Sequence, residues 1–292
     1  MNIESLLQSA VRLGLPLLLA GLGILIASKS GIILIAMEGA LELAAFFSVY
    51  FCFLTGSALF GQLMAVIVSI LYMLLFTCII IKGQGNQVVS GVGLNFFATG
   101  VSSVLLAALM DTKNISPSVN RLPIWDYPLV GQQSSNLLLG IFLAVGVWLL
   151  LNYTNFGLRI RAIGENPAAA DSLGINVHRY QFLAMILVGI LGGIAGSELS
   201  IGQMGYYTRS LATTKGYMAF SVVVLGTYRP GFILLASLLV GLIDGLQMRA
   251  QTFFDLPGQL FLSRPYLLTI FALIFAKKAR GPASEGFAYE RE

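Results

Sequence analysis

Four acidic side chains lie inside long apolar runs of this sequence: Glu38, Glu42, Glu198 and Asp244. A charge at the depth of a lipid bilayer is costly, so such residues face protein or water. They then serve a solute or ion path, or bond to neighbouring helices. Glu38 and Glu42 are one helical turn apart and share a face, where two ionised carboxylates would repel each other. We predict that Glu38, Glu42 and Glu198 belong to a substrate pathway.

Two features single out Glu38 and add Asn95 to this pathway. Glu38 lies beside Gly31 and Gly39, where a break in a membrane helix would free backbone groups. Asn95 is an uncharged polar group within another apolar run. Its amide either binds a hydroxylated or heterocyclic solute or bonds to a neighbouring carbonyl, and both readings stay open.

Patterns that would indicate other chemistry are absent from the sequence. It contains no G-x-x-x-x-G-K-[ST] phosphate-binding loop and no G-x-S-x-G nucleophile motif. His178 is the sole histidine, and Cys52 and Cys78 are too far apart for a metal-binding cluster. We therefore expect no metal, no cofactor and no enzyme activity within this chain.

The composition indicates a polytopic membrane protein. Of 292 residues, 57% are hydrophobic and only 10% are charged, with a mean hydropathy of +0.85. Soluble domains carry about 25% charged residues, so a soluble fold would lack polar surface. The net charge of +4 is small and scattered, which does not favour nucleic-acid binding.

The apolar runs predict an all-α fold of about eight to ten transmembrane helices, forming a single domain over residues 1–292. A spanning helix needs about 20 mostly apolar residues. The candidate runs are 13–27, 32–55, 63–81, 88–110, 136–151, 180–200, 216–228, 231–248 and 265–276. The run 216–228 is short enough to be a half-helix. Glycine-interrupted starts near residues 30–39 and 215–226 suggest an inverted repeat.

Charge distribution gives the expected orientation. Residues 157–179 form a polar segment between apolar runs and carry three arginines, which places the segment in the cytoplasm. Lys29, Lys82, Arg229 and the basic tail 277–292 then lie on the same side, whereas the loop 111–135 lies outside as a lid or a short helix. Arg209 and Lys215 fall on the opposite side, where we expect them to face an aqueous entrance.

The segment 157–179 is predicted to contain a short helix in water. Proline suits the first turn of a helix, so Asn166 should precede a helix that starts at Pro167. Three alanines continue it and Gly174 can end it. A helix this short is not stable alone, so it should pack against something; the alternative is a solvated connector.

The motif GENPAAA at residues 164–170 resembles the cytoplasmic coupling helix of ABC-importer permeases of the branched-chain amino acid, ribose and nucleoside type. Residues 30–39 are similar to the S-G-x-x-N-x-x-x-E-G signature of the nucleoside and simple-sugar branch, with Leu34 in place of the asparagine. Residues 86–95 and 215–231 also resemble that branch. The resemblance implies ATPase-coupling roles for Gly164, Glu165, Asn166, Pro167, Ala168, Ala169, Asp171 and Gly174.

This resemblance implies a multi-pass permease of the bacterial plasma membrane that imports a nucleoside or a simple sugar. Its partners would be a separate ABC ATPase, a second permease subunit and an extracytoplasmic binding protein or lipoprotein. The chain's small size and Leu34 favour a heterodimer with a related, longer permease. A branched-chain amino acid or riboflavin remains an alternative solute. An ion-coupled secondary transporter that uses Glu38, Glu42 and Asp244 is the alternative of a different class.

Overall fold

The computed structural model describes residues 3–127, 130–253, 281–287 and 289. In chain order these residues form α1 (Ile3–Lys29), α2 (Met37–Thr55), α3 (Ala58–Ile81), α4 (Gln87–Met110), β1 (Ile124–Tyr127), β2 (Gly131–Ser134), α5 (Asn136–Tyr153), α6 (Asn155–Glu165), α7 (Pro167–Ser172), α8 (Val177–Ser197), a π-helical turn η1 (Glu198–Gly202), α9 (Lys215–Leu225) and α10 (Pro230–Phe253).

Seven of the described helices are long and apolar enough to cross a membrane: α1, α2, α3, α4, α5, α8 and α10. Helix α9 has 11 residues and is too short to cross, as predicted for a half-helix. The predicted span 265–276 and the cations at 277–280 lie outside the described residues. The all-α, multi-span architecture is confirmed.

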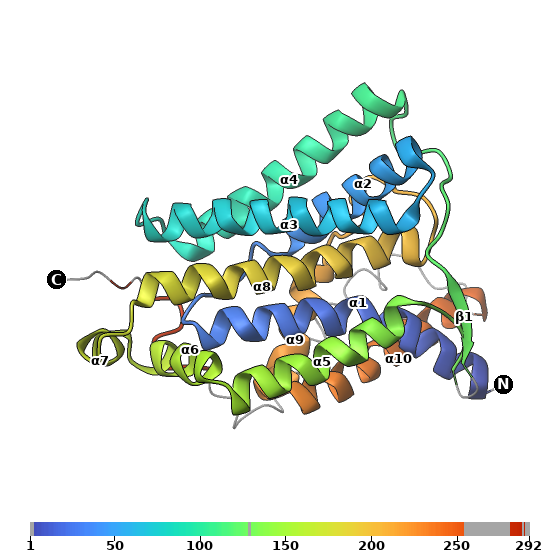
Figure 1. The fold of residues 1–292 in the computed structure, drawn as a ribbon. Helices are drawn as coiled ribbons and strands as arrows, with labels where there is room; N and C mark the ends of the chain where they lie inside the picture. Colours follow the sequence, from blue (N-terminus) through green and yellow to red (C-terminus); the bar gives the residue numbers. More distant parts are fainter. Residues whose placement is uncertain (1–2, 128–129, 254–280, 288, 290–292) are drawn as a thin grey trace.

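The centre of the bundle consists of α1, α2 and α8, which are the most deeply buried spans. Helix α1 packs against α8, α9 and α10, while α3 covers α2 and α8. In Figure 1, α4 diverges from α3 towards one end of the bundle. Helices α4 and α5 are buried over less than a third of their apolar length, so their outer faces are left for lipid or another subunit.

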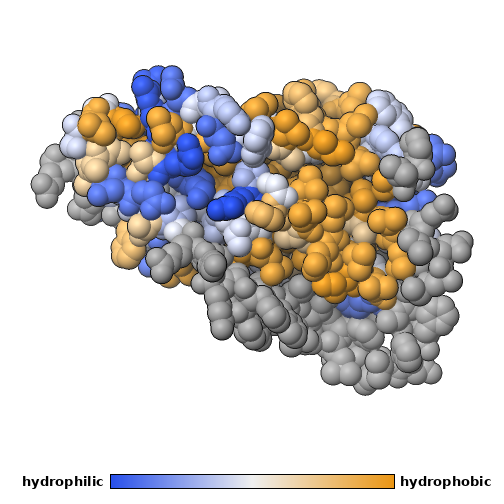
Figure 2. Space-filling view, turned by 90° about the horizontal axis from the view of Figure 1, so that it is seen from below, coloured by the Kyte–Doolittle hydropathy of each residue, from blue (hydrophilic) through white to orange (hydrophobic). Residues whose placement is uncertain are grey.

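The two ends of the bundle differ. Helices α6 and α7 and the described C-terminal residues lie at one end, and the N-terminus and the hairpin β1–β2 lie at the other (Figure 1). From below, polar surface gathers at the α6–α7 end and apolar surface covers the middle of the molecule (Figure 2). This is the surface pattern of a protein that crosses a bilayer along its long axis.

Two sequence predictions about local structure were wrong. The loop 111–135 was expected to be a lid or a short helix; its described residues contain a hairpin and no helix, with Ile124 paired to Ser134 and Tyr127 to Gly131, and its role as a lid stays a prediction. The span predicted over 32–55 becomes helical only at Met37, and Gly39 lies inside α2 instead of breaking it. The chain does break at Gly31, the other glycine expected to mark a break, because Gly31 has a φ of +85°, a left-handed conformation that glycine adopts without strain.

The polar segment 157–179 holds more helix than predicted. Helix α6 begins at Asn155, where the Thr154 side chain accepts a hydrogen bond from the Gly157 N–H at 3.1 Å. The short helix α7 begins at Pro167, as predicted. Its preceding residue Asn166 caps it by accepting a hydrogen bond from the Ala169 N–H at 3.0 Å.

Candidate functional site

The acids of α2 hold the segment that leads into the half-helix α9. Glu42 accepts hydrogen bonds from the Tyr207 hydroxyl and, at 2.8 Å, from the Ala212 N–H. Glu38 accepts one from the Thr214 N–H at 3.0 Å. A carboxylate that accepts backbone N–H bonds replaces the partners a non-helical segment lacks in a membrane. One turn of α2 therefore anchors residues 207–214.

The start of α9 lies directly against the start of α2. A methyl group added at Gly216 would lie 2.7 Å from both the Glu38 backbone nitrogen and its Cβ. Only glycine fits such a contact, so the two helix starts meet at Glu38 and Gly216. These are the two segments that the sequence paired as a repeat; the repeat itself stays a prediction.

Asn95 and Gln87 of α4 bind the non-helical backbone between α1 and α2. Asn95 accepts a hydrogen bond from the Gly39 N–H at 2.8 Å and donates one to the Ile35 carbonyl at 2.9 Å. Gln87 accepts one from the Ile33 N–H at 2.8 Å. Two roles were open for Asn95, solute binding and hydrogen bonding to a neighbouring carbonyl. The structure shows the second, with bonds to backbone groups at the start of α2. Because α4 holds this break, a movement of α4 would be passed to the first turn of α2.

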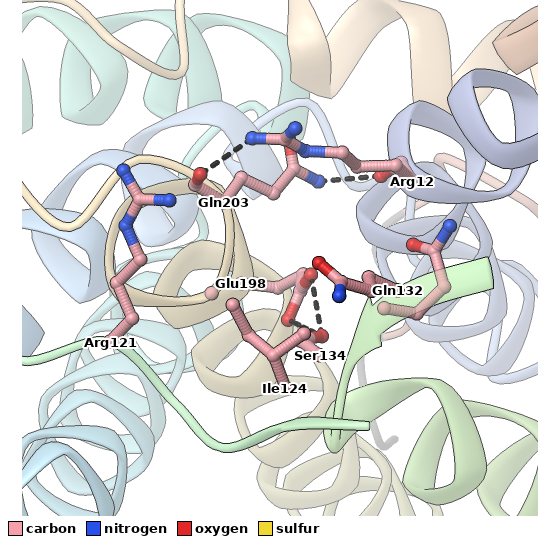
Figure 3. A pocket seen from close by; sticks show the side chains of 9 residues that line it. Arg12, Arg121, Ile124, Gln132, Ser134, Glu198 and Gln203 are labelled. Atoms are coloured by element: carbon pink, nitrogen blue, oxygen red, sulfur yellow. Dashed lines mark hydrogen bonds between the residues drawn. The ribbon is translucent and has the colours of Figure 1, made fainter. Parts of the chain in front are cut away.

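Glu198 lines a pocket at the hairpin end of the bundle (Figure 3). Glu198 is 2% exposed, and its carboxylate accepts hydrogen bonds from the Ser134 hydroxyl at 2.8 Å and the Asn136 amide at 2.9 Å. Arg12 and Gln203 bridge one side, each donating to the other's backbone carbonyl at 2.6 Å. The pocket has a volume of about 160 Å³ and a mostly polar lining.

Asp244 of α10 forms an ion pair with Lys215, the first residue of α9. The Lys215 Nζ lies 3.4 Å from the Asp244 Oδ2. The Asp244 side chain is 1% exposed and that of Lys215 is 20% exposed. Lys215 thus contacts an intramembrane acid while its side chain stays partly exposed, and the aqueous entrance expected at Arg209 and Lys215 stays a prediction. Pairing of this kind reduces the cost of both charges at bilayer depth.

At the opposite end, α7 projects from the bundle on a small apolar base. Ala170 packs with Ile163 and Val177, and all three are buried. Leu173, which follows α7, is 80% exposed. Gly174 has a φ of +81° and ends the motif, as the sequence predicted. The helix is therefore fixed to the bundle by one face and presents the other to the outside.

The α6–α7 end also holds Lys29 and Tyr228. Lys29 lies over the Tyr228 ring, 5.9 Å from its centroid. Burial, with a further contribution from the charge of Glu285, raises the pKa of Tyr228 to about 12. Burial also raises the pKa of Glu285, against the opposing effects of the nearby Ser28 hydroxyl and the Lys29 charge.

The predicted site residues thus fall into three separate groups. Glu38, Glu42 and Asn95 lie together around the start of α2, Glu198 lies near the hairpin end, and the predicted coupling residues lie around α6 and α7. The sequence did not single out Gln87, Tyr207 or Asn136. Gln87 had a usable signal, since a buried amide beside the start of an apolar run needs a partner.

Comparison with known proteins identifies the class. The family model described as "Branched-chain amino acid transport system / permease component" matches residues 6–274. In Lactococcus lactis subsp. cremoris, the chain is similar to the nucleoside ABC transporter permease protein NupC, at 30% identity over 99% of both chains. In the same strain it is similar to the nucleoside ABC transporter permease protein NupB, at 27% identity over 78% of this chain and 68% of NupB.

A third relative, from Haloferax volcanii, is the putative glucose ABC transporter permease protein TsgC13, at 31% identity over 85% of this chain and 78% of the relative. Among solved structures, PsaBC from Streptococcus pneumoniae in complex with Fab has the same fold. Its TM-score is 0.52 at 15% identity, over 95% of this chain and 92% of that chain.

These findings define a multi-pass permease subunit of an ABC transporter, located in the cell membrane. The chain belongs to the branched-chain amino acid transport system permease family. Membership implies that it works with other ABC transporter subunits, namely an ATPase and a further permease.

Proposed function

We propose that this permease imports a nucleoside or a simple sugar, with energy supplied by ATP hydrolysis on a separate ATPase subunit. Two relatives named as nucleoside permeases and one as a putative glucose permease support the solute class. An extracytoplasmic binding protein or lipoprotein delivers the solute at the hairpin end. The permease pairs with a related second permease, as the presence of both NupC and NupB in one strain suggests.

The observation that carries this proposal is the exposed face of α7. Leu173 is 80% exposed in the most polar part of the chain, and Ala168 and Ala169 are exposed beside it. Burial of a leucine is worth about 1.5–3 kcal/mol, so such a side chain favours a covering partner. We assign the ATPase as that partner. Residues 164–174 form the contact that passes ATP-driven movement to the spans.

Transport then proceeds by alternating access. Closure of the ATPase pair displaces α7, and the displacement reaches the region where α2, α4 and α9 meet around Glu38 and Asn95. Because Glu38 and Glu42 hold residues 207–214, movement of α2 carries the start of α9 with it. The substrate-pathway role of these residues and of Glu198 remains part of the proposal.

Uptake of labelled nucleoside and of glucose by the assembled transporter, with its ATPase and second permease, tests the proposal. Replacement of Glu165 or Pro167 should abolish uptake while membrane insertion is unchanged. Leu173→Glu tests the docking surface on α7. Its matched control is Ile115→Glu, because Ile115 is also an exposed aliphatic side chain, 55% exposed, but lies at the opposite end of the bundle. Leu173→Glu should release the ATPase and Ile115→Glu should not. Normal uptake by Glu165 and Pro167 variants would refute the coupling role.

An ion-coupled mechanism is the alternative of a different class, motivated by the buried acids. Vanadate-sensitive, ATP-dependent uptake supports the ABC mechanism. Collapse of uptake by a protonophore, with the ATP concentration held constant, supports ion coupling instead. Ligand binding by the partner binding protein decides between a nucleoside, a sugar, a branched-chain amino acid and riboflavin.

A further inference from the structure

The described C-terminal residues, 281–287 and 289, bind three parts of the α6–α7 end at once. We call these residues the C-terminal brace. They contact the end of α6, the turn between α1 and α2, and α7. No motif in the sequence marked them as part of a functional site.

The brace supplies hydrogen-bond donors to the C-terminal end of α6. The last carbonyls of a helix have no partner within the helix, and Pro167 has no N–H to offer one. The Ser284 N–H donates to the Gly164 carbonyl at 2.9 Å, and the Ser284 hydroxyl donates to the Glu165 carbonyl at 3.1 Å. The Ala283 N–H lies 3.4 Å from the Glu165 carboxylate. Glu165 is therefore held at both its backbone and its side chain.

The same segment reaches the turn between α1 and α2 and also α7. The Gly286 N–H donates to the Gly31 carbonyl at 3.0 Å. The Tyr289 hydroxyl donates to the Asp171 carboxylate at 3.1 Å, and the Tyr289 ring lies 6.0 Å from that of His178. Gly31 begins the non-helical stretch that leads to Glu38. A short run of chain thus links α7 to the first residues of the candidate pathway.

A close backbone contact strengthens this link. A methyl group at Gly164 would lie 2.5 Å from the Lys29 carbonyl oxygen and 3.1 Å from the Pro282 Cβ. The end of α6 is therefore packed between the end of α1 and the brace. Pro282 is buried there, while Phe287 points away and is 73% exposed. The attachment depends largely on hydrogen bonds to main-chain atoms, which single substitutions can remove.

We propose that the C-terminal brace positions the coupling helix and passes its displacement to the turn between α1 and α2. This inference rests on the proposed function, in which α7 docks on the ATPase. When the brace is attached, α7 already has the orientation in which it binds the ATPase, so binding does not have to supply the entropic cost of ordering α7. Without the brace, α7 remains attached through Ala170 but its orientation relaxes.

The test compares Ser284→Pro and Tyr289→Phe with the control Phe287→Ala in the full-length permease, assembled with its second permease. Two quantities are measured: amide hydrogen exchange of residues 165–173, and the affinity of the membrane complex for the ATPase subunit. A lost hydrogen bond corresponds to about a fivefold change in an equilibrium. We expect Ser284→Pro to accelerate exchange and weaken ATPase binding by about fivefold or more, Tyr289→Phe to do so less, and Phe287→Ala to change neither.

Ser284→Thr keeps both the N–H and the hydroxyl, so the hydrogen exchange and the ATPase affinity of this variant should equal the wild-type values. The inference is overturned if Ser284→Pro and Tyr289→Phe match Phe287→Ala, or if exchange accelerates while ATPase affinity stays unchanged. Failure of the proposed function gives a different result. In that case Leu173→Glu leaves ATPase affinity at the wild-type value, which shows that α7 is not the docking element.

Discussion

Removal of Lys215 should destabilise the permease more than removal of its partner Asp244. The two charges lie 3.4 Å apart, but Asp244 is 1% exposed and Lys215 is 20% exposed. Lys215→Met keeps an apolar stem and leaves a carboxylate buried in the bundle. Breaking a buried pair in this way costs about 3–5 kcal/mol. Because the lysine is partly solvated, we place the cost near the lower limit, at about 3 kcal/mol.

Asp244→Asn leaves the ammonium group instead, and a lysine can extend its charge towards water. We therefore expect a cost of only about 1 kcal/mol, in the range of a solvated pair. The double variant leaves no charge, so it should be more stable than Lys215→Met alone. Reversible unfolding of the four proteins in detergent micelles gives the double-mutant cycle. Equal costs for the two single variants, or simple additivity in the double variant, would refute this reasoning.

Three further predictions concern packing, the hydrogen bonds from Asn95 of α4 to the backbone at the start of α2, and pH. Gly189→Ala should lower the free energy of unfolding by about 1–3 kcal/mol, because the added methyl group would lie 2.6 Å from the Ile70 Cα. Gly100→Ala is the control: its methyl group meets no atom within 4 Å, so this variant should be neutral or stabilising. Thermal unfolding in detergent compares the two variants. Asn95→Leu should cost about 1–3 kcal/mol in the same assay, because it leaves the Gly39 N–H and the Ile35 carbonyl without this partner, and an unchanged melting temperature would contradict this role of Asn95. Burial raises the pKa of Glu285 above 4.5, so the contribution of Glu285 to folded-state stability is fully present below pH 4.5 and is lost as the pH rises through the raised pKa. Glu285→Gln should therefore remove this pH dependence from hydrogen exchange at residues 281–287. A pH dependence equal to that of the wild type would contradict this prediction.

The sequence predicted the spans and the short helix at Pro167 because each has a strong local cause. Long apolar runs in a chain with few charges leave a membrane helix as the stable solution. At Asn166 and Pro167, capping chemistry and the restricted conformation before proline set the helix start without help from distant residues. Element type was therefore predictable wherever the signal lay within a few neighbouring residues.

The contacts of the acids could not be predicted, because their partners are distant in the chain. Glu42 bonds to residues about 170 positions away, and Glu198 to Ser134 and Asn136 of the hairpin end. Burial and polarity identified these acids as groups that need partners. Which partner each one takes depends on how the spans pack.

The position of the helix break also depends on residues that are distant in the chain. Of the two glycines expected to mark a break, Gly31 does so and Gly39 does not; Gln87 and Asn95 of α4 supply bonds to the backbone between Ile33 and Gly39. The C-terminal brace was invisible for a related reason. Its attachment depends on the Ser284 N–H and hydroxyl, which meet main-chain carbonyls at the end of α6, and such contacts between segments about 120 residues apart leave no local sequence pattern.

The most direct test of the account is a cysteine cross-link from α7 to the ATPase subunit in native membranes. Ser172→Cys lies on the exposed part of α7, and Ile115→Cys at the hairpin end is the matched control. We expect Ser172→Cys to link to the ATPase in high yield and this link to block ATP-driven uptake, whereas Ile115→Cys should give no such link. A permease that cross-links to the ATPase from Ile115→Cys, or not at all from Ser172→Cys, would contradict the account.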